Sequence, residues 1–141
     1  LGDVYKRQGL ARAQLYGENF SSYLERVNSK NIEIIVQFEH VDVLENIDEI
    51  LSIDEIGGFM IGPYDFTSSM GIHGQFENPL FTKKLEQIKQ INKKHGKTQG
   101  FHLIDPDPGA FKQLLDKEYN FIVYSIDTKH ISSSAKEIFN V

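Results

Sequence analysis

Two apolar segments that each lead to a carboxylate constrain the fold of this chain most strongly. Ile32–Phe38 is rich in β-branched residues and is followed by Glu39, and Phe59–Ile61 is followed by Gly-Pro-Tyr and then Asp65. Such apolar runs are typical of strands that are covered on both faces in a parallel sheet, and functional residues follow the carboxyl ends of such strands. We therefore expect Glu39 and Asp65 to lie at the same edge of a parallel sheet.

The segment between these two strands has the periodicity of a helix. Val43, Leu44, Ile47, Ile50 and Leu51 recur at a spacing that places them on one helical face. The order strand, helix, strand implies a parallel βαβ unit with a right-handed crossover.

Further helices and strands are predicted on both sides of this unit. The spacing of apolar residues predicts helices over about Asn19–Asn28, from Asn78-Pro79 to Gly96, around Phe111–Leu115 and over Lys129–Val141. Strands are predicted over Thr98–Leu103 and Asn120–Tyr124, and Thr67–Glu77 is predicted to be a long polar loop.

Four strands that alternate with helices define an α/β chain. An eight-stranded (β/α)8 barrel of the TIM type needs about 250 residues. The 141 residues fit half of such a barrel, or a small open doubly wound sheet. Composition and periodicity leave both architectures open.

Composition excludes several classes of protein. With a net charge of -5 the chain has no basic surface for nucleic acid or an anionic membrane, and no apolar run approaches the ~18 residues that a membrane span needs. The absence of cysteine excludes disulfides and thiolate metal sites, and we expect a cytoplasmic protein. Leu1–Gln8 resembles translated adaptor sequence, so we expect a non-native or poorly ordered leader there and a domain over residues 9–141.

Three interpretations of Glu39 and Asp65 are open from the residues alone. Two carboxylates at one sheet edge can bind Mg2+ or Mn2+, can act as an acid–base pair, or can cap helices and pair with nearby cations. Gln37 shares a strand face with Glu39 and can point into the same space. No two histidines have metal-ligand spacing, although His102 lies near a strand end.

Two segments together resemble the HpcH/HpaI aldolase family of class II pyruvate aldolases. They are Val36-Gln37-Phe38-Glu39 and Ile61-Gly62-Pro63-Tyr64-Asp65-Phe66, the second followed by Ser68-Ser69-Met70-Gly71. The resemblance implies the C-terminal half of a TIM-type barrel. It also implies that Glu39 and Asp65 bind a divalent metal (Mg2+, Mn2+ or Co2+) and that Gln37 and the backbone amides of Tyr64 and Asp65 hold the substrate.

The function implied by the resemblance is that of a carbon–carbon lyase. Such an enzyme cleaves a 4-hydroxy-2-oxo acid to pyruvate and an aldehyde through a metal-bound enolate, and it is a homo-oligomer that acts on small molecules. The family's catalytic histidine, its partner aspartate and an arginine match nothing before Gly9, so we expect this chain alone to be inactive. The alternatives are a citrate-synthase-like or acyl-CoA lyase relative, and a non-catalytic α/β domain.

Overall fold

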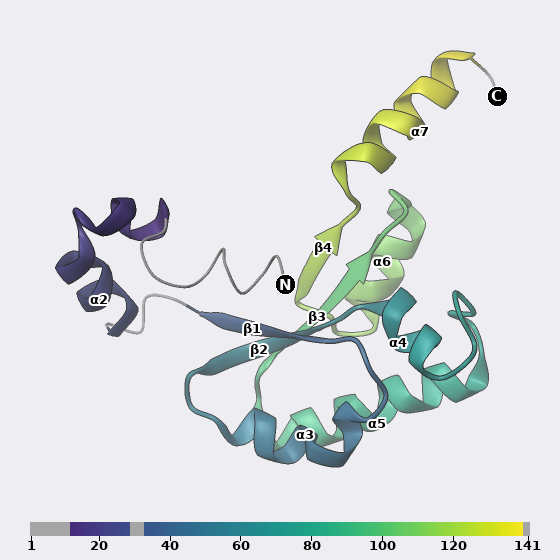
Figure 1. Ribbon diagram of the computed structural model, residues 1–141. Coiled ribbons are helices and arrows are strands. Elements are labelled where there is room, and N and C mark those ends of the chain that lie inside the picture. The colour runs from purple at the N-terminus through teal and green to yellow at the C-terminus, as the bar shows by residue number, and fades with distance from the viewer. Residues whose placement is uncertain (1–11, 29–32, 140–141) are drawn as a thin grey trace. The chain divides into compact units, whose positions relative to one another are not determined.

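The computed structural model describes residues 12–28 and 33–139, which belong to two units, residues 1–33 and 34–141 (Figure 1). In the first unit a 3-10 helix, η1 (Arg12–Gly17), precedes helix α2 (Phe20–Asn28). The helix predicted over about Asn19–Asn28 is thus confirmed. Residues 1–8, where a leader is predicted, lie outside the described residues.

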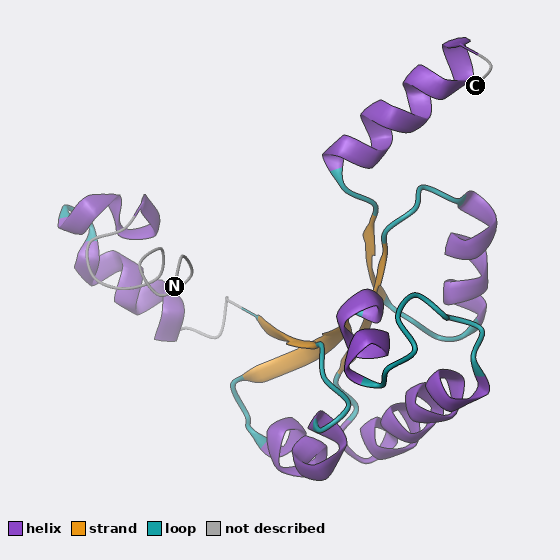
Figure 2. Cartoon of the chain, turned by 45° about the vertical axis from the view of Figure 1, so that its right-hand side comes forward, coloured by secondary structure: helices purple, strands orange, loops and turns teal. Residues whose placement is uncertain are grey.

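The second unit alternates strands and helices along the chain (Figure 2). Its strands are β1 (Ile34–Phe38), β2 (Ile56–Ile61), β3 (Thr98–Leu103) and β4 (Phe121–Tyr124). Its helices are α3 (Val43–Ser52), α4 (Pro63–Ser69), α5 (Pro79–His95), α6 (Pro108–Asp116) and α7 (Asp127–Phe139). In the described ranges, no helix is both long and apolar enough to cross a membrane.

All four strands lie in one parallel sheet in the order β1-β2-β3-β4. Sequence order and spatial order therefore coincide, which is the arrangement of successive β/α units in a barrel of the TIM type. Within the described sheet, β1 and β4 are the edge strands. The predicted α/β class and the predicted parallel pairing are confirmed.

The two faces of β1 and β2 have different roles. Phe38, Phe59 and Ile61 face the helices and are buried, and the rings of Phe38 and Phe59 stack with centroids 4.9 Å apart. They form one core with residues from the helices, among them Ile47, Leu51, Phe66, Phe81 and Ile88. Because strand side chains alternate between faces, Gln37 and Glu39 lie on the face opposite this core.

Helix α5 follows the sequence signals that predicted it. The Asn78 side chain accepts a hydrogen bond from the Leu80 amide at 2.9 Å, Pro79 occupies the first turn, and Gly96 ends the helix with φ 62°. Helix α5 packs beside α3, where Asp48 contacts both Lys94 and His95.

Helix α4 corrects the prediction of a loop beginning at Thr67. Gly62 precedes the helix, Pro63 occupies its first position, and the Phe66 amide donates to the Gly62 carbonyl at 2.9 Å. The buried Thr67 hydroxyl donates to the Pro63 carbonyl at 2.7 Å. The polar connection after β2 therefore begins with a helix that runs to Ser69, and Asp65 lies in its first turn.

Candidate functional site

Glu39 directly follows β1, and Gln37 orients its carboxylate. The Gln37 Nε2 group donates a hydrogen bond to Glu39 Oε1 at 2.7 Å. Both side chains are exposed, on the face of the sheet away from the helical core. The predicted shared face of Gln37 and Glu39 is confirmed, and the hydrogen bond occupies one carboxylate oxygen while the other stays available for a further partner.

Gly62 brings the end of β2 against this pair. Its amide donates to the Phe38 carbonyl at 3.0 Å, which extends the β1–β2 pairing to the carboxyl ends of both strands. A Cβ at position 62 would lie 2.9 Å from Gln37 Nε2 and 3.2 Å from Glu39 Cγ. The φ of −94° is open to any residue, so glycine is favoured here by the close approach of these side chains and not by its backbone conformation.

The first turn of α4 presents polar groups at the same end of the sheet. Asp65 is exposed in this turn and forms no ion pair with another described residue. Pro63 has no amide hydrogen, and among the described residues the amides of Tyr64 and Asp65 find no hydrogen-bond acceptor. Free amides at the start of a helix favour an anionic group.

A second contact joins the loop after Glu39 to α4. The Val41 amide donates to Ser69 Oγ at 2.9 Å, and Ser69 Oγ donates to the Phe66 carbonyl at 2.7 Å. Thr67 Oγ1 accepts from the Gly74 amide at 3.0 Å, which fixes the chain beyond the helix. The segments that carry Glu39 and Asp65 are therefore connected at two points, through Gly62 and through Ser69.

The donor set suits a hard divalent cation. Carboxylate oxygens are the ligands that Mg2+ prefers, so Glu39 and Asp65 have the chemistry to hold such an ion, while the free amides suit an anionic group of a ligand. In the described ranges no three His, Cys, Asp or Glu side chains are grouped so that they could hold a metal ion. A cation bound by Glu39 and Asp65 needs further ligands from substrate, from water or from residues beyond those described.

The histidines have separate surroundings. His40 contacts Asp42 at 3.3 Å, and His95 contacts Asp48 at 2.9 Å. His73 contacts the Ser68 hydroxyl, and its ring packs against that of Tyr64. His102 Nε2 lies 3.4 Å from the Ser125 carbonyl oxygen. These contacts agree with ordinary structural roles.

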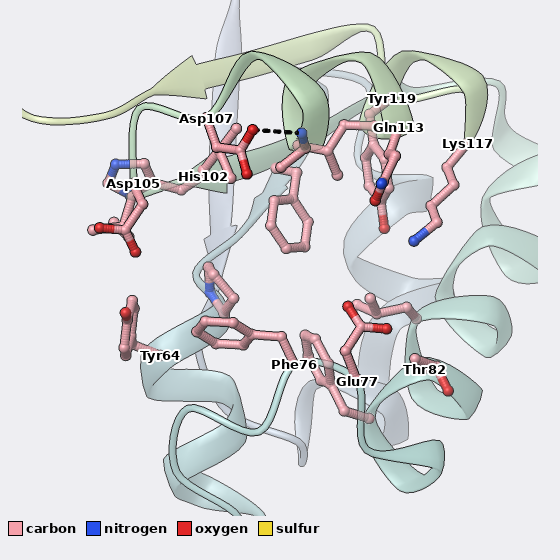
Figure 3. Close-up of a pocket in the computed structure, with 18 residues that line it drawn as sticks. Tyr64, Phe76, Glu77, Thr82, His102, Asp105, Asp107, Gln113, Lys117 and Tyr119 are labelled. Atoms are coloured by element: carbon pink, nitrogen blue, oxygen red, sulfur yellow. Dashed lines mark hydrogen bonds between the residues drawn. The ribbon is translucent and has the colours of Figure 1, made fainter.

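Sequence reasoning did not predict a cavity of about 270 Å³ at the carboxyl end of β3. Figure 3 shows its lining, which comes from the start of α4, from α5, from β3 and the loop after it, and from α6. Gln37, Glu39 and Asp65 are not among the residues that line it. The cavity forms between elements far apart in the sequence, so no local pattern could have indicated it.

The parallel β/α units and the polar groups beyond β1 and β2 are those of an α/β barrel protein with a site at the carboxyl ends of its strands. A family model described as HpcH/HpaI aldolase/citrate lyase matches residues 11–134. The chain belongs to this family.

Related proteins agree with this assignment. The chain is 32% identical over 120 residues to a 2-keto-3-deoxy-L-rhamnonate aldolase of Klebsiella pneumoniae. The matched residues make up 85% of this chain and 43% of the relative. A family member of known structure from Burkholderia cenocepacia J2315 matches with a TM-score of 0.79 and 22% identity over 94% of this chain and 50% of its own. A citrate synthase structure matches with a TM-score of 0.63 and 20% identity, over 96% of this chain and 54% of its own. The chain thus spans about half the length of the proteins it matches.

Proposed function

We propose that this chain contributes the metal- and pyruvate-binding part of a class II aldolase, a carbon–carbon lyase that cleaves a 4-hydroxy-2-oxo acid to pyruvate and an aldehyde. The observation that carries the proposal is the contact of Gly62 with the Gln37–Glu39 pair, directly before the turn that holds Asp65. The similarity to a 2-keto-3-deoxy-L-rhamnonate aldolase supports the same class of substrate.

Each proposed site residue has a defined task. Glu39 and Asp65 hold a divalent cation (Mg2+, Mn2+ or Co2+), which when bound supplies positive charge for the enolate that forms as the carbon–carbon bond breaks. The amides of Tyr64 and Asp65 receive the substrate carboxylate. Gln37 holds Glu39 by its hydrogen bond and helps to hold the pyruvyl group.

The proton is transferred by a group other than Gln37, Glu39 and Asp65. Cleavage requires a base that takes the proton of the 4-hydroxyl, and carboxylates bound to a cation are weak bases. We propose that this base lies outside the described residues, and that residues 1–141 alone bind the cation and the oxo acid without turnover.

The similarity to a citrate synthase supports a second candidate function. A citrate-synthase-like relative would use the same carboxylates for an enolate of a different acid. If the chain belongs to an aldolase, pyruvate should strengthen cation binding. If the chain belongs to a citrate synthase, citrate should strengthen cation binding and pyruvate should not.

Titration of the 141-residue chain with Mn2+, followed by electron paramagnetic resonance, tests the proposal. We expect one site whose affinity rises when pyruvate is added and falls at least about tenfold in Glu39→Gln and in Asp65→Asn. The matched controls Glu45→Gln and Asp54→Asn remove exposed carboxylates elsewhere and should bind like the wild type. Equal Mn2+ binding by all five proteins would overturn the proposal in favour of a non-catalytic domain, and retro-aldol turnover by the chain alone would overturn the division of tasks.

A further inference from the structure

The cavity at the carboxyl end of β3 has an apolar, largely aromatic floor. Phe81, Phe101 and Leu114 line it and are at most 9% exposed, and Phe76 lines it beside them. The aromatic rings pack against one another in tilted geometry, with the centroids of Phe76 and Phe81 6.3 Å apart. With about 270 Å³ the cavity is at the small end of ligand pockets, and its size suits one ring or a branched alkyl group.

One buried hydroxyl in this cavity, that of Tyr119, has no hydrogen-bond partner among the described residues, although the charge of the Glu86 carboxylate acts on it. Tyr119 is 4% exposed, and its ring packs edge-on against Phe101 with centroids 5.3 Å apart. Its hydroxyl makes no hydrogen bond to any residue that the structure describes, and it points into the cavity (Figure 3). A buried hydroxyl without a partner is unfavourable, so a ligand that accepts its hydrogen bond gains affinity.

Opposite charges face each other at the same end of the cavity. Lys117, two residues before Tyr119, extends its ammonium group toward the Tyr119 hydroxyl, and the Glu77 carboxylate faces them from the other side (Figure 3). Among the described residues, neither Lys117 nor Glu77 forms an ion pair. A ligand that carries both an anionic and a cationic group can therefore engage both side chains.

From these three features we propose that the cavity binds a free α-amino acid with an aromatic or branched apolar side chain. The side chain occupies the floor formed by Phe76, Phe81 and Phe101. The carboxylate accepts from the Tyr119 hydroxyl and pairs with Lys117, and the ammonium group pairs with Glu77. Each polar group of the ligand thus meets a group of complementary charge or hydrogen-bonding character.

This site is distinct from the proposed cation site and does not rest on the aldolase assignment. Glu39 and Asp65 do not line the cavity, whereas Pro63 and Tyr64 do. The first turn of α4 thus contributes to the lining of the cavity, but none of the side chains proposed to hold the cation does. Binding of an amino acid can be measured without metal, oxo acid or turnover.

Isothermal titration calorimetry of the 141-residue chain with four small probes tests the assignment. L-phenylalanine should bind, whereas phenylpropionate, which lacks the ammonium group, and phenethylamine, which lacks the carboxylate, should each bind at least about tenfold more weakly. Glycine, which lacks the apolar side chain, should not bind measurably. Equal binding of phenylpropionate and L-phenylalanine would overturn the amino-acid assignment, and no binding of L-phenylalanine would overturn the site.

Matched variants locate the binding. Tyr119→Phe removes only the hydroxyl and should weaken L-phenylalanine binding about tenfold, and a urea midpoint at or above that of the wild type would prove that the variant folds. Lys117→Met, directly after the end of α6, should have a similar effect, whereas Lys112→Met within α6, outside the cavity lining, should bind like the wild type. Ala110→Leu should fill the cavity and abolish binding, and Ala135→Leu on α7 should not. Wild-type affinity in both Tyr119→Phe and Ala110→Leu would place the ligand elsewhere and overturn the proposal.

Discussion

The backbone amide of Val41 donates a hydrogen bond to the hydroxyl of Ser69, 28 residues further along the chain, at 2.9 Å. This bond ties the loop after Glu39 to the last residue of α4, the helix that carries Asp65. Together with the bond from the Gly62 amide to the Phe38 carbonyl, it holds the two carboxylate-bearing segments at both ends of α4. The arrangement of the proposed site therefore depends on groups that would never contact the substrate.

Loss of the Ser69 hydroxyl should destabilise the chain and loosen the site. We expect Ser69→Ala to lower the free energy of unfolding by ~1–2 kcal/mol, because the part-buried Val41 amide loses its acceptor. The control Ser52→Ala removes an exposed hydroxyl that donates to the Asp48 carbonyl, and its effect should stay within ~0.5 kcal/mol. Urea unfolding measures both variants, and equal effects would contradict the role assigned to Ser69.

A methyl group at position 62 should disturb the proposed cation site more than the fold. The new Cβ would displace the flexible end of Gln37, 2.9 Å away, and press on Glu39 Cγ. We expect Gly62→Ala to lower the free energy of unfolding by no more than ~1 kcal/mol. Mn2+ affinity should fall about tenfold, because the carboxylate loses its orientation. Unchanged Mn2+ affinity in a folded Gly62→Ala chain would contradict the proposed role of Glu39.

A glycine-to-alanine substitution in the middle of the sheet, at Gly100, should instead disturb the fold more than the proposed cation site. A Cβ at Gly100 would lie 2.7 Å from the Phe59 carbonyl oxygen and 3.1 Å from that of Phe121, and these backbone atoms are fixed in the parallel sheet. We expect Gly100→Ala to lower the free energy of unfolding by ~3 kcal/mol in urea titrations. A loss as small as that of Gly62→Ala would show that the neighbouring strands can move apart.

The contact between α3 and α5 should make stability depend on pH in the acid range. The hydrogen bond from His95 and the charge of Lys94 lower the pKa of Asp48 from its ordinary 3.8. A lowered pKa in the folded state adds stability above the unfolded value, and this contribution is lost as the pH falls through the folded value. The urea midpoint of the wild type should therefore exceed that of Asp48→Asn above about pH 5, and the difference should shrink below about pH 4.

Removal of the His95 hydrogen bond, which is the largest cause of the lowered Asp48 pKa, provides the control for this pH effect. In a His95→Gln background, Asp48→Asn should change the midpoint less than it does in the wild type, because the hydrogen bond that contributes most to the lowered pKa is gone. Asp48 is exposed, so the whole effect should be small and should weaken further in salt. A difference between wild type and Asp48→Asn that does not change with pH would contradict this account.

Local signals were strong enough to predict the regular elements. Thr98–Leu103 agrees with β3 residue for residue, and α5 lies between the Asn78 cap and the Gly96 terminus that its sequence indicates. Both elements combine a clear apolar period with defined ends, so packing and local preference agree. The shared strand face of Gln37 and Glu39 followed from the two-residue period of a strand and needed no tertiary information.

Helix α4 was missed because its sequence lacks such signals. Thr67, Ser68 and Ser69 are poor helix formers with side chains that compete for backbone hydrogen bonds. In the structure these hydroxyls bond back to carbonyls of the preceding turn, and Thr67 and Phe66 are fully buried. Tertiary packing therefore stabilises a helix that local preference disfavours. The sequence did not predict the cavity beside Tyr119 either, because its walls come from elements that only tertiary packing brings together.

Gly62 and Ser69 connect one continuous stretch, residues 34–69, that holds β1, α3, β2 and α4. Every residue proposed to hold the cation or the pyruvyl group lies in this stretch. The proposed site is therefore local in sequence, because two consecutive β/α units supply all of its groups and the strands and helices that follow contribute none of them.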